Sequence, residues 1–216
     1  MTAATPSPQL ARLSRASRLR IEQAVLETFS EQEFHKVSLI DIARGASVSL
    51  QTIYKYYGGK EALLFGTLDT QLGALAVRMI DHLQGIETFE DRLRKVLWVI
   101  FDYFEGHPRV AQLLMSSVYL NTWSQTDTFR QPELFAIFMQ VLREGRSKGI
   151  LTDEVDEKVL LDILIGVASR TITMWILRGQ PAGLAEQSQV LFRLLWRAIT
   201  PAAAGHGTVD AKPALA

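Results

Sequence analysis

The chain has 216 residues, 48% of them hydrophobic, and its 23 Lys and Arg residues balance 23 Asp and Glu residues. This length allows one large domain or two small ones, and the zero net charge excludes a uniformly basic nucleic-acid-binding protein. The absence of cysteine excludes disulfides, zinc–thiolate sites and thiol catalysis. We expect a cytoplasmic protein with no membrane span, because no uncharged apolar stretch of about 18 residues occurs.

Long stretches rich in Leu, Ala, Ile, Glu and Arg, without alternating valine-rich runs, predict an all-α protein of about nine helices. Residues 1–13 are rich in Pro, Ser, Thr and Ala, and we expect a disordered arm there. Four arginines then occur with almost no acid among them: Arg12, Arg15, Arg18 and Arg20. They can lie along DNA phosphates, with Arg18 as a candidate contact, or form the solvated end of a first helix that begins near Ser14.

Residues 38–60 predict two short helices separated by a tight break. Ser38 and Ser49 are suitable N-caps for these helices. At about 100° per residue, the second helix has Ile53 and Tyr57 on one apolar face. Its opposite face is polar, cationic and aromatic, with Gln51, Thr52, Lys55 and Tyr56. This arrangement predicts a helix-turn-helix, whose second helix lies in the DNA major groove, although a helix pair inside an ordinary core is the alternative.

A helical body is expected over residues 60–199, followed by a disordered tail over residues 200–216. The first helix of the body begins only two glycines after the helix-turn-helix, so it can connect the two parts mechanically. Residues 159–177 are apolar on nearly all sides, which indicates burial on more than one side. Other helices of the body could cover them, but a second subunit is the simpler way to do so.

Large apolar side chains in the body suit an apolar or aromatic ligand, although each taken singly is more often core packing. The candidates for an effector pocket are Trp98, Phe101, Met115, Tyr119, Trp123, Phe138 and Trp175. Arg170 is a further candidate, because it stands in an apolar helix where it could bind an acidic effector or cross a dimer interface. It could also pair with a buried acid such as Asp102 or Asp162, or extend to solvent.

A resemblance to the N-terminal DNA-binding domain of the TetR family of bacterial transcription regulators is carried by RIEQAVLETFSEQEFHKVSLIDIARGASVSLQTIYKYYGGKEALL. Many positions agree with the family pattern in order and spacing: Phe29, Phe34, Ser38 to Ala43, Ala46 to Ser49, Tyr54 to Tyr57 and Lys60 to Leu63. Some positions depart from it. Glu33 and Ser47 stand where the family usually has glycine, Tyr57 where it has Phe, and Gly59 where it has Ser or Asn.

The resemblance implies a helix-turn-helix domain over residues 14–59 and an effector-binding and dimerisation domain over residues 60–199. It implies phosphate contacts from Ser38, Tyr54, Tyr56 and Lys60, while the residue chemistry suggests base contacts from Gln51, Thr52 and Lys55. The full set of expected DNA contacts is Arg18, Ser38, Ser49, Gln51, Thr52, Tyr54, Lys55, Tyr56 and Lys60.

The function favoured by the sequence is a repressor that binds a palindromic double-stranded DNA operator and is released by a small apolar or aromatic effector. The resemblance implies that it is a homodimer joined by its last two helices. An activator, or a ligand-binding helical dimer without DNA function, is the alternative. We expect no enzymatic activity, cofactor or metal site, because the four histidines are scattered and no glycine-rich phosphate loop occurs.

Overall fold

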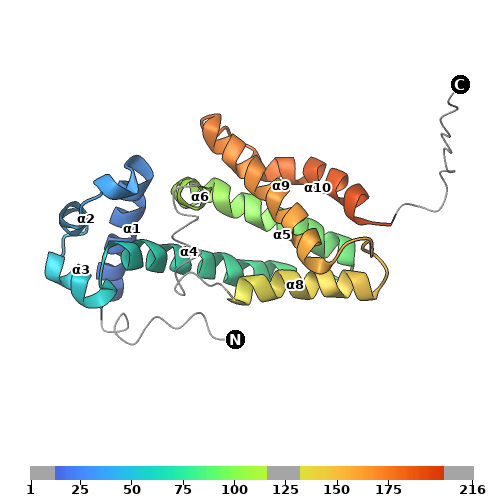
Figure 1. The fold of residues 1–216 in the computed structure, drawn as a ribbon, viewed down its shortest axis with the longest axis horizontal. Coiled ribbons are helices and arrows are strands. Elements are labelled where there is room, and N and C mark those ends of the chain that lie inside the picture. The colour runs from blue at the N-terminus through green and yellow to red at the C-terminus, as the bar shows by residue number, and fades with distance from the viewer. Residues whose placement is uncertain (1–12, 116–131, 202–216) are drawn as a thin grey trace, which may run out of the picture.

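The computed structural model describes residues 13–115 and 132–201 (Figure 1). Tyr119 and Trp123 lie outside these ranges, as do all but one residue of the predicted arm and all but two of the predicted tail. The described residues form nine α helices and one short 3₁₀ helix, η2, and contain no strand. The predicted all-α fold is therefore confirmed.

The N-terminal unit contains α1 (Arg15–Glu31), η2 (Phe34–Lys36), α2 (Leu39–Gly45) and α3 (Leu50–Tyr57). Both predicted N-caps are present. The Ser38 hydroxyl accepts a hydrogen bond from the Ile40 amide, and the Ser49 hydroxyl accepts one from the Thr52 amide. The two short helices therefore begin where serine can satisfy a backbone N–H that would otherwise lack a partner.

The body contains α4 (Lys60–Leu83), α5 (Phe89–Gly106), α6 (Pro108–Met115), α8 (Pro132–Ser147), α9 (Glu157–Leu177) and α10 (Leu184–Ile199). Figure 1 shows the N-terminal unit at one end of α4, with the other helices of the body beyond it. Because α4 packs against α1 and α3 as well as α5 and α8, it belongs to both parts of the molecule. One continuous hydrophobic core extends from Ile21 in α1 to Ile199 in α10.

A second contact between the two parts is made by α6, which packs against α1. An Arg109 Nη atom lies 3.1 Å from Glu27 Oε1, and Gln112 Nε2 donates a hydrogen bond of 2.9 Å to the Ser30 carbonyl. The N-terminal unit is thus held to the body through two separate helices, α4 and α6.

The start of α10 is stabilised by a carboxylate from another helix. Glu105, near the end of α5, accepts hydrogen bonds from the amides of Gly183 at 2.7 Å and Ala185 at 2.9 Å. Burial raises the pKa of Glu105, but hydrogen bonds from the backbone of Ala185, Gly183 and Leu184 outweigh that effect and leave the pKa below its usual value. Because Gly183 itself has no side chain to cap α10, Glu105 supplies the cap from a distance.

Two helices, α4 and α9, are long and apolar enough to cross a membrane by length and composition, a property that core helices of soluble proteins share. In the most apolar stretch of α4, 50% of the residues are buried, whereas in α9 only 28% are. The sequence predicts burial of α9 on more than one side, yet a single chain leaves much of its apolar surface uncovered. The exposed apolar residues of α9 and α10 are Val159, Ile163, Ile165, Leu177, Val190 and Leu194.

The turn between α2 and α3 contains a residue in a left-handed backbone conformation. Ser47 has a φ of 52°, and its amide and that of Val48 donate to carbonyls near the end of α2. Arg20 from α1 supports the same turn, since its Nε donates to the Ala46 carbonyl at 3.0 Å. A side chain in this conformation costs about 1–2 kcal/mol, which glycine avoids.

We therefore expect Ser47→Gly to raise the free energy of unfolding by about 1 kcal/mol. This is the net effect of relieving the strain in the folded state and of the larger entropy that glycine gives the unfolded chain, which opposes folding. Urea unfolding followed by circular dichroism measures this change. Ser47→Ala is the matched control, because it removes the hydroxyl but keeps Cβ, and its stability should stay within about 0.5 kcal/mol of the parent. An equal gain in the alanine variant would show that backbone strain is not the cause.

Candidate DNA interface and ligand cavity

The outer face of α3 presents the polar side chains that the sequence places there. Gln51 and Lys55 are exposed, whereas Ile53 on the opposite side is completely buried in the core. Tyr54 is 53% exposed and is therefore not a core residue. The Lys55 ammonium lies 5.4 Å from the centre of the Tyr56 ring, which places a cation and an aromatic surface together. Hydroxyl, amide and ammonium groups on one exposed helix face are suited to phosphates and base edges.

The smaller polar residues of this surface are partly used to order the helices. Ser49 caps α3 and its Oγ also lies 2.8 Å from Thr52 Oγ1. Ser38 is half-buried at the start of α2. Both hydroxyls act as acceptors in these caps, and the Ser49 proton is free for another acceptor only when Thr52 is the donor in their contact.

Arg18 and Tyr57 both interact electrostatically with Glu22, a buried carboxyl group on α1. Arg18 Nε lies 3.9 Å from Glu22 Oε1, and Glu22 is only 6% exposed. Burial raises the pKa of Glu22, and the Arg18 charge counteracts part of that rise. Burial, followed by the nearby Glu22 charge, raises the pKa of Tyr57 to about 12. Tyr57 packs against the core, as its place on the apolar face of α3 predicts.

Lys60 directs its ammonium into the N-terminal unit. Nζ donates hydrogen bonds to the Phe34 carbonyl at 2.8 Å and to the Val37 carbonyl at 3.0 Å. The same atom lies 4.7 Å from the centre of the Phe34 ring. Lys60 is half-buried, unlike Lys55, whose side chain is exposed.

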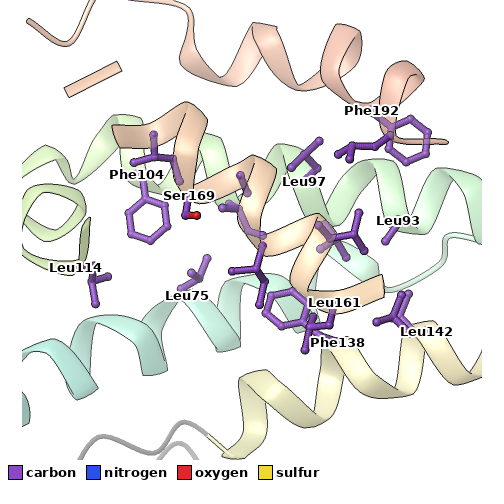
Figure 2. Close-up of a pocket in the computed structure, with 18 of the residues that line it drawn as sticks. Leu75, Leu93, Leu97, Phe104, Leu114, Phe138, Leu142, Leu161, Ser169 and Phe192 are labelled. Carbon is purple, nitrogen blue, oxygen red and sulfur yellow. The ribbon is translucent and has the colours of Figure 1, made fainter. Parts of the chain in front are cut away.

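A cavity of about 220 Å³ lies inside the body, and side chains from α4, α5, α6, α8, α9 and α10 converge on it (Figure 2). Most of the lining is aliphatic, with Phe104, Phe138 and Phe192 adding aromatic rings. Among the described residues that line it, Ser169 alone has a polar side chain, and its hydroxyl donates to the Gly166 carbonyl at 3.2 Å. Such a cavity can hold an apolar group and offers one hydroxyl for a polar atom of a ligand.

Two of the predicted effector residues, Met115 and Phe138, line this cavity. Phe101 and Trp175 do not line it: Phe101 is completely buried elsewhere in the core, and Trp175 is buried with its Nε1 donating to the Pro181 carbonyl at 2.7 Å. Arg170 is exposed on α9 and does not line the cavity.

Trp98 also lies away from the cavity, on the polar side of α5. The Lys95 ammonium is 3.8 Å from the centre of its ring, and the His82 ring of α4 packs edge-on against it. Asp102, one of the acids considered as a partner for Arg170, is paired with Arg78 of α4.

Aliphatic residues form most of the cavity wall and were not among the predicted effector residues. Leu75, Leu93 and Leu97 are examples, and they belong to the same apolar stripes as fully packed residues of α4 and α5. A stripe in the sequence shows which face of a helix is buried, but it carries no signal for an empty space beside that face.

Comparisons with known proteins match both parts of the chain. Residues 21–66 match the family described as bacterial regulatory proteins, tetR family, and residues 68–198 match the C-terminal region of YsiA-like proteins. The fatty acid metabolism regulator protein of Bacillus subtilis is 24% identical over 180 residues, which cover 82% of this chain and 92% of that protein. A transcriptional repressor of Streptomyces coelicolor is 27% identical over 165 residues, covering 76% of this chain and 82% of that protein.

Solved structures with the same fold include two proteins named FadR. The Bacillus halodurans protein, a fatty acid degradation regulator, aligns with a TM-score of 0.76 and 18% identity over 86% of this chain and 97% of that chain. The Bacillus subtilis protein, solved in complex with stearoyl-CoA, aligns with a TM-score of 0.75 and 22% identity over 82% of this chain and 96% of that chain.

The second family match alone covers more than half of the chain, and it includes every described residue that lines the cavity. The first match covers the α2–α3 pair with its exposed polar face. The chain therefore belongs to the TetR family of bacterial regulatory proteins, and it is a ligand-responsive, DNA-binding regulator of transcription.

Proposed function

We propose that the protein is a cytoplasmic repressor, without enzymatic activity, that leaves its operator when the acyl chain of an acyl thioester occupies the cavity. The observation that carries this proposal is the cavity itself, whose walls, as far as residues 13–115 and 132–201 form them, are aliphatic and aromatic apart from the Ser169 hydroxyl. Aliphatic walls match a hydrocarbon chain, and the Ser169 hydroxyl can bind a carbonyl oxygen at its end if it turns its proton away from the Gly166 carbonyl. Support comes from the Bacillus subtilis structure with stearoyl-CoA and from the name of the fatty acid metabolism regulator.

The size of the cavity limits which chains fit without rearrangement. Ligand pockets usually measure about 300–1,000 Å³, and this cavity measures about 220 Å³. We therefore expect medium-length acyl chains to fit the cavity directly, and longer chains to require movement of its side chains or to extend beyond it. Titration with octanoyl-CoA, dodecanoyl-CoA and stearoyl-CoA distinguishes these cases, with coenzyme A alone as the control for the head group.

For the DNA-binding domain, residues 14–59, we propose that α3 lies in the major groove of a palindromic operator. Gln51, Thr52 and Lys55 would meet base edges, while Tyr54, Tyr56 and Ser38 would meet phosphates. Their exposure or position at a helix start supports these roles. Ser49 is the N-cap of α3, and Arg18 lies on α1 beside Glu22.

For the effector-binding and dimerisation domain, residues 60–199, we propose a homodimer joined through α9 and α10. The apolar residues that a single chain leaves exposed on these two helices support it, since a partner would remove them from water. A dimer would place its two DNA-binding units on half-sites about one helical turn, roughly 34–36 Å, apart.

Two helices can carry a change in the cavity to the DNA-binding unit. Leu72 and Leu75 of α4 line the cavity, and the same helix begins against the N-terminal unit. Leu114 and Met115 at the end of α6 also line it, while Arg109 and Gln112 of that helix hold α1. A ligand that binds more tightly to one position of these helices than to another would shift the protein toward that position. The change in DNA affinity is limited by the ratio of the ligand's affinities for the two positions.

We expect Lys55→Ala to weaken specific DNA binding by about 1–3 kcal/mol and to relax the preference for one base. The measurement compares a duplex selected by the protein from a random pool with single-base variants of that duplex. Lys36→Ala, which removes an exposed lysine from η2, is the control. An equal loss on every duplex would assign Lys55 to phosphate contact.

We expect Ala168→Phe to fill part of the cavity, so that an acyl chain can enter only by overpacking it. Overpacking costs about 1–3 kcal/mol, and acyl-CoA binding should therefore weaken roughly tenfold or more. DNA binding should persist, so that the variant stays on its duplex when dodecanoyl-CoA is added. Ala74→Phe, on the exposed side of α4, is the matched control and should respond like the parent. Unchanged acyl-CoA binding by Ala168→Phe would place the ligand site elsewhere.

We expect Leu194→Glu to shift the protein toward monomers, because it introduces a charge at an apolar residue of α10 that is 58% exposed in one chain. Analytical ultracentrifugation measures this shift. The matched control is Val77→Glu on α4, which is 46% exposed and lies outside the proposed interface. A Leu194→Glu protein that remained dimeric would exclude α10 from the interface.

A further inference from the structure

Lys60 stands at the first position of α4, where the helix dipole opposes a positive charge. Its side chain leaves that position and reaches η2, where Nζ donates to the carbonyls of Phe34 at 2.8 Å and Val37 at 3.0 Å. Phe34 is the first residue of η2 and Val37 is its C-cap, so the ammonium binds the carbonyl groups of this short helix. The Phe34 ring, 4.7 Å from Nζ, covers the same charge.

These contacts join two points of the chain that flank the helix-turn-helix. Val37 stands directly before Ser38, the N-cap of α2, and Lys60 stands three residues after Tyr57, the last residue of α3. The chain from residue 37 to residue 60 therefore forms a loop that contains α2 and α3, and the Lys60 ammonium closes it.

The covalent connection between α3 and α4 is flexible by composition. It consists of Gly58, with a φ of 86°, and Gly59, which is extended. A Cβ atom at either glycine would meet nothing within 4 Å, so neither is held in place by close packing. Glycine restricts the backbone least of all residues, so the position of α3 relative to α4 depends on other contacts, which are the packing of α3 on α4 and the hydrogen bonds of Lys60.

We propose that Lys60 is a positioning residue that closes the helix-turn-helix and so sets the position of α2 and α3 relative to α4. Its ammonium acts through the carbonyls of η2, and the DNA phosphates are bound by other side chains. This role differs from the phosphate contact that the family resemblance implies for Lys60. A direct contact would require the ammonium to leave two carbonyl groups and an aromatic ring.

Substitutions separate hydrogen bonding from charge. Lys60→Met keeps a long side chain without a donor, and Lys60→Gln removes the charge but keeps an N–H donor for the carbonyls. Lys55→Met serves as the variant of a proposed DNA contact, and Lys36→Met as the variant of an exposed lysine on η2. Affinity is measured at several salt concentrations on the duplex selected from a random pool, at a temperature where circular dichroism shows each variant to be folded.

We expect Lys60→Met to bind every duplex about tenfold more weakly, and Lys60→Gln to recover part of that loss. The slope of log affinity against log salt is negative, and its magnitude should match that of Lys36→Met, because the magnitude falls by about 0.9 only for each phosphate contact that is lost. A magnitude smaller by about 0.9, with Lys60→Gln as weak as Lys60→Met, would overturn the proposal in favour of a phosphate contact. Parental affinity in folded Lys60→Met, with only a lower melting temperature, would also overturn it.

A second measurement uses the parent protein and does not depend on how the variants fold. Brief acetylation with acetic anhydride, read by mass spectrometry, compares the reactivity of each lysine with and without the selected duplex. Lys60 should react slowly in both states, whereas Lys55 should react fast in the free protein and slowly on DNA. A Lys60 that reacts fast in free protein and is protected by DNA would overturn the proposal.

Discussion

The structure depends on one helix, α4, whose apolar residues belong to both parts of the molecule. Leu63 and Leu64, near its start, are completely buried, and the helix packs there against the N-terminal unit. Leu72 and Leu75, two to three turns later, line the cavity of the body. A rigid helix cannot adjust one of these regions independently of the other, because its backbone hydrogen bonds keep its residues in fixed relation. This constraint places the ligand cavity and the DNA-binding face on a shared mechanical element.

Local features of the fold could be predicted from the sequence because their causes are local. Ser38 and Ser49 cap the helices at which they were expected. Ile53 is buried and Lys55 is exposed because residues two positions apart in a helix lie on nearly opposite sides of it. Each of these outcomes needs information from no more than a few neighbouring positions.

Features that depend on distant parts of the chain could not be predicted in this way. The position of the Lys60 side chain depends on two carbonyl groups that lie 23 and 26 residues away in the sequence. No residue near Lys60 in the sequence indicates that its ammonium binds them. Trp98 was expected in the pocket on account of its size, but it lies against Lys95 and His82 on the polar side of α5. The cavity is lined mainly by leucines whose pattern is that of ordinary core residues, so composition pointed to aromatic side chains instead.

The position of Ile165 relates the cavity to the surface of α9. It lines the cavity and is 45% exposed, and Ile163 two residues earlier is exposed without lining it. In a homodimer joined through α9 and α10, a ligand beside Ile165 would therefore lie next to the partner. Ligand binding and dimerisation would then be linked reciprocally. If the ligand changes the dimerisation constant by some factor, dimerisation changes the affinity for the ligand by the same factor. The apparent affinity for the effector would then depend on how much of the protein the cell contains.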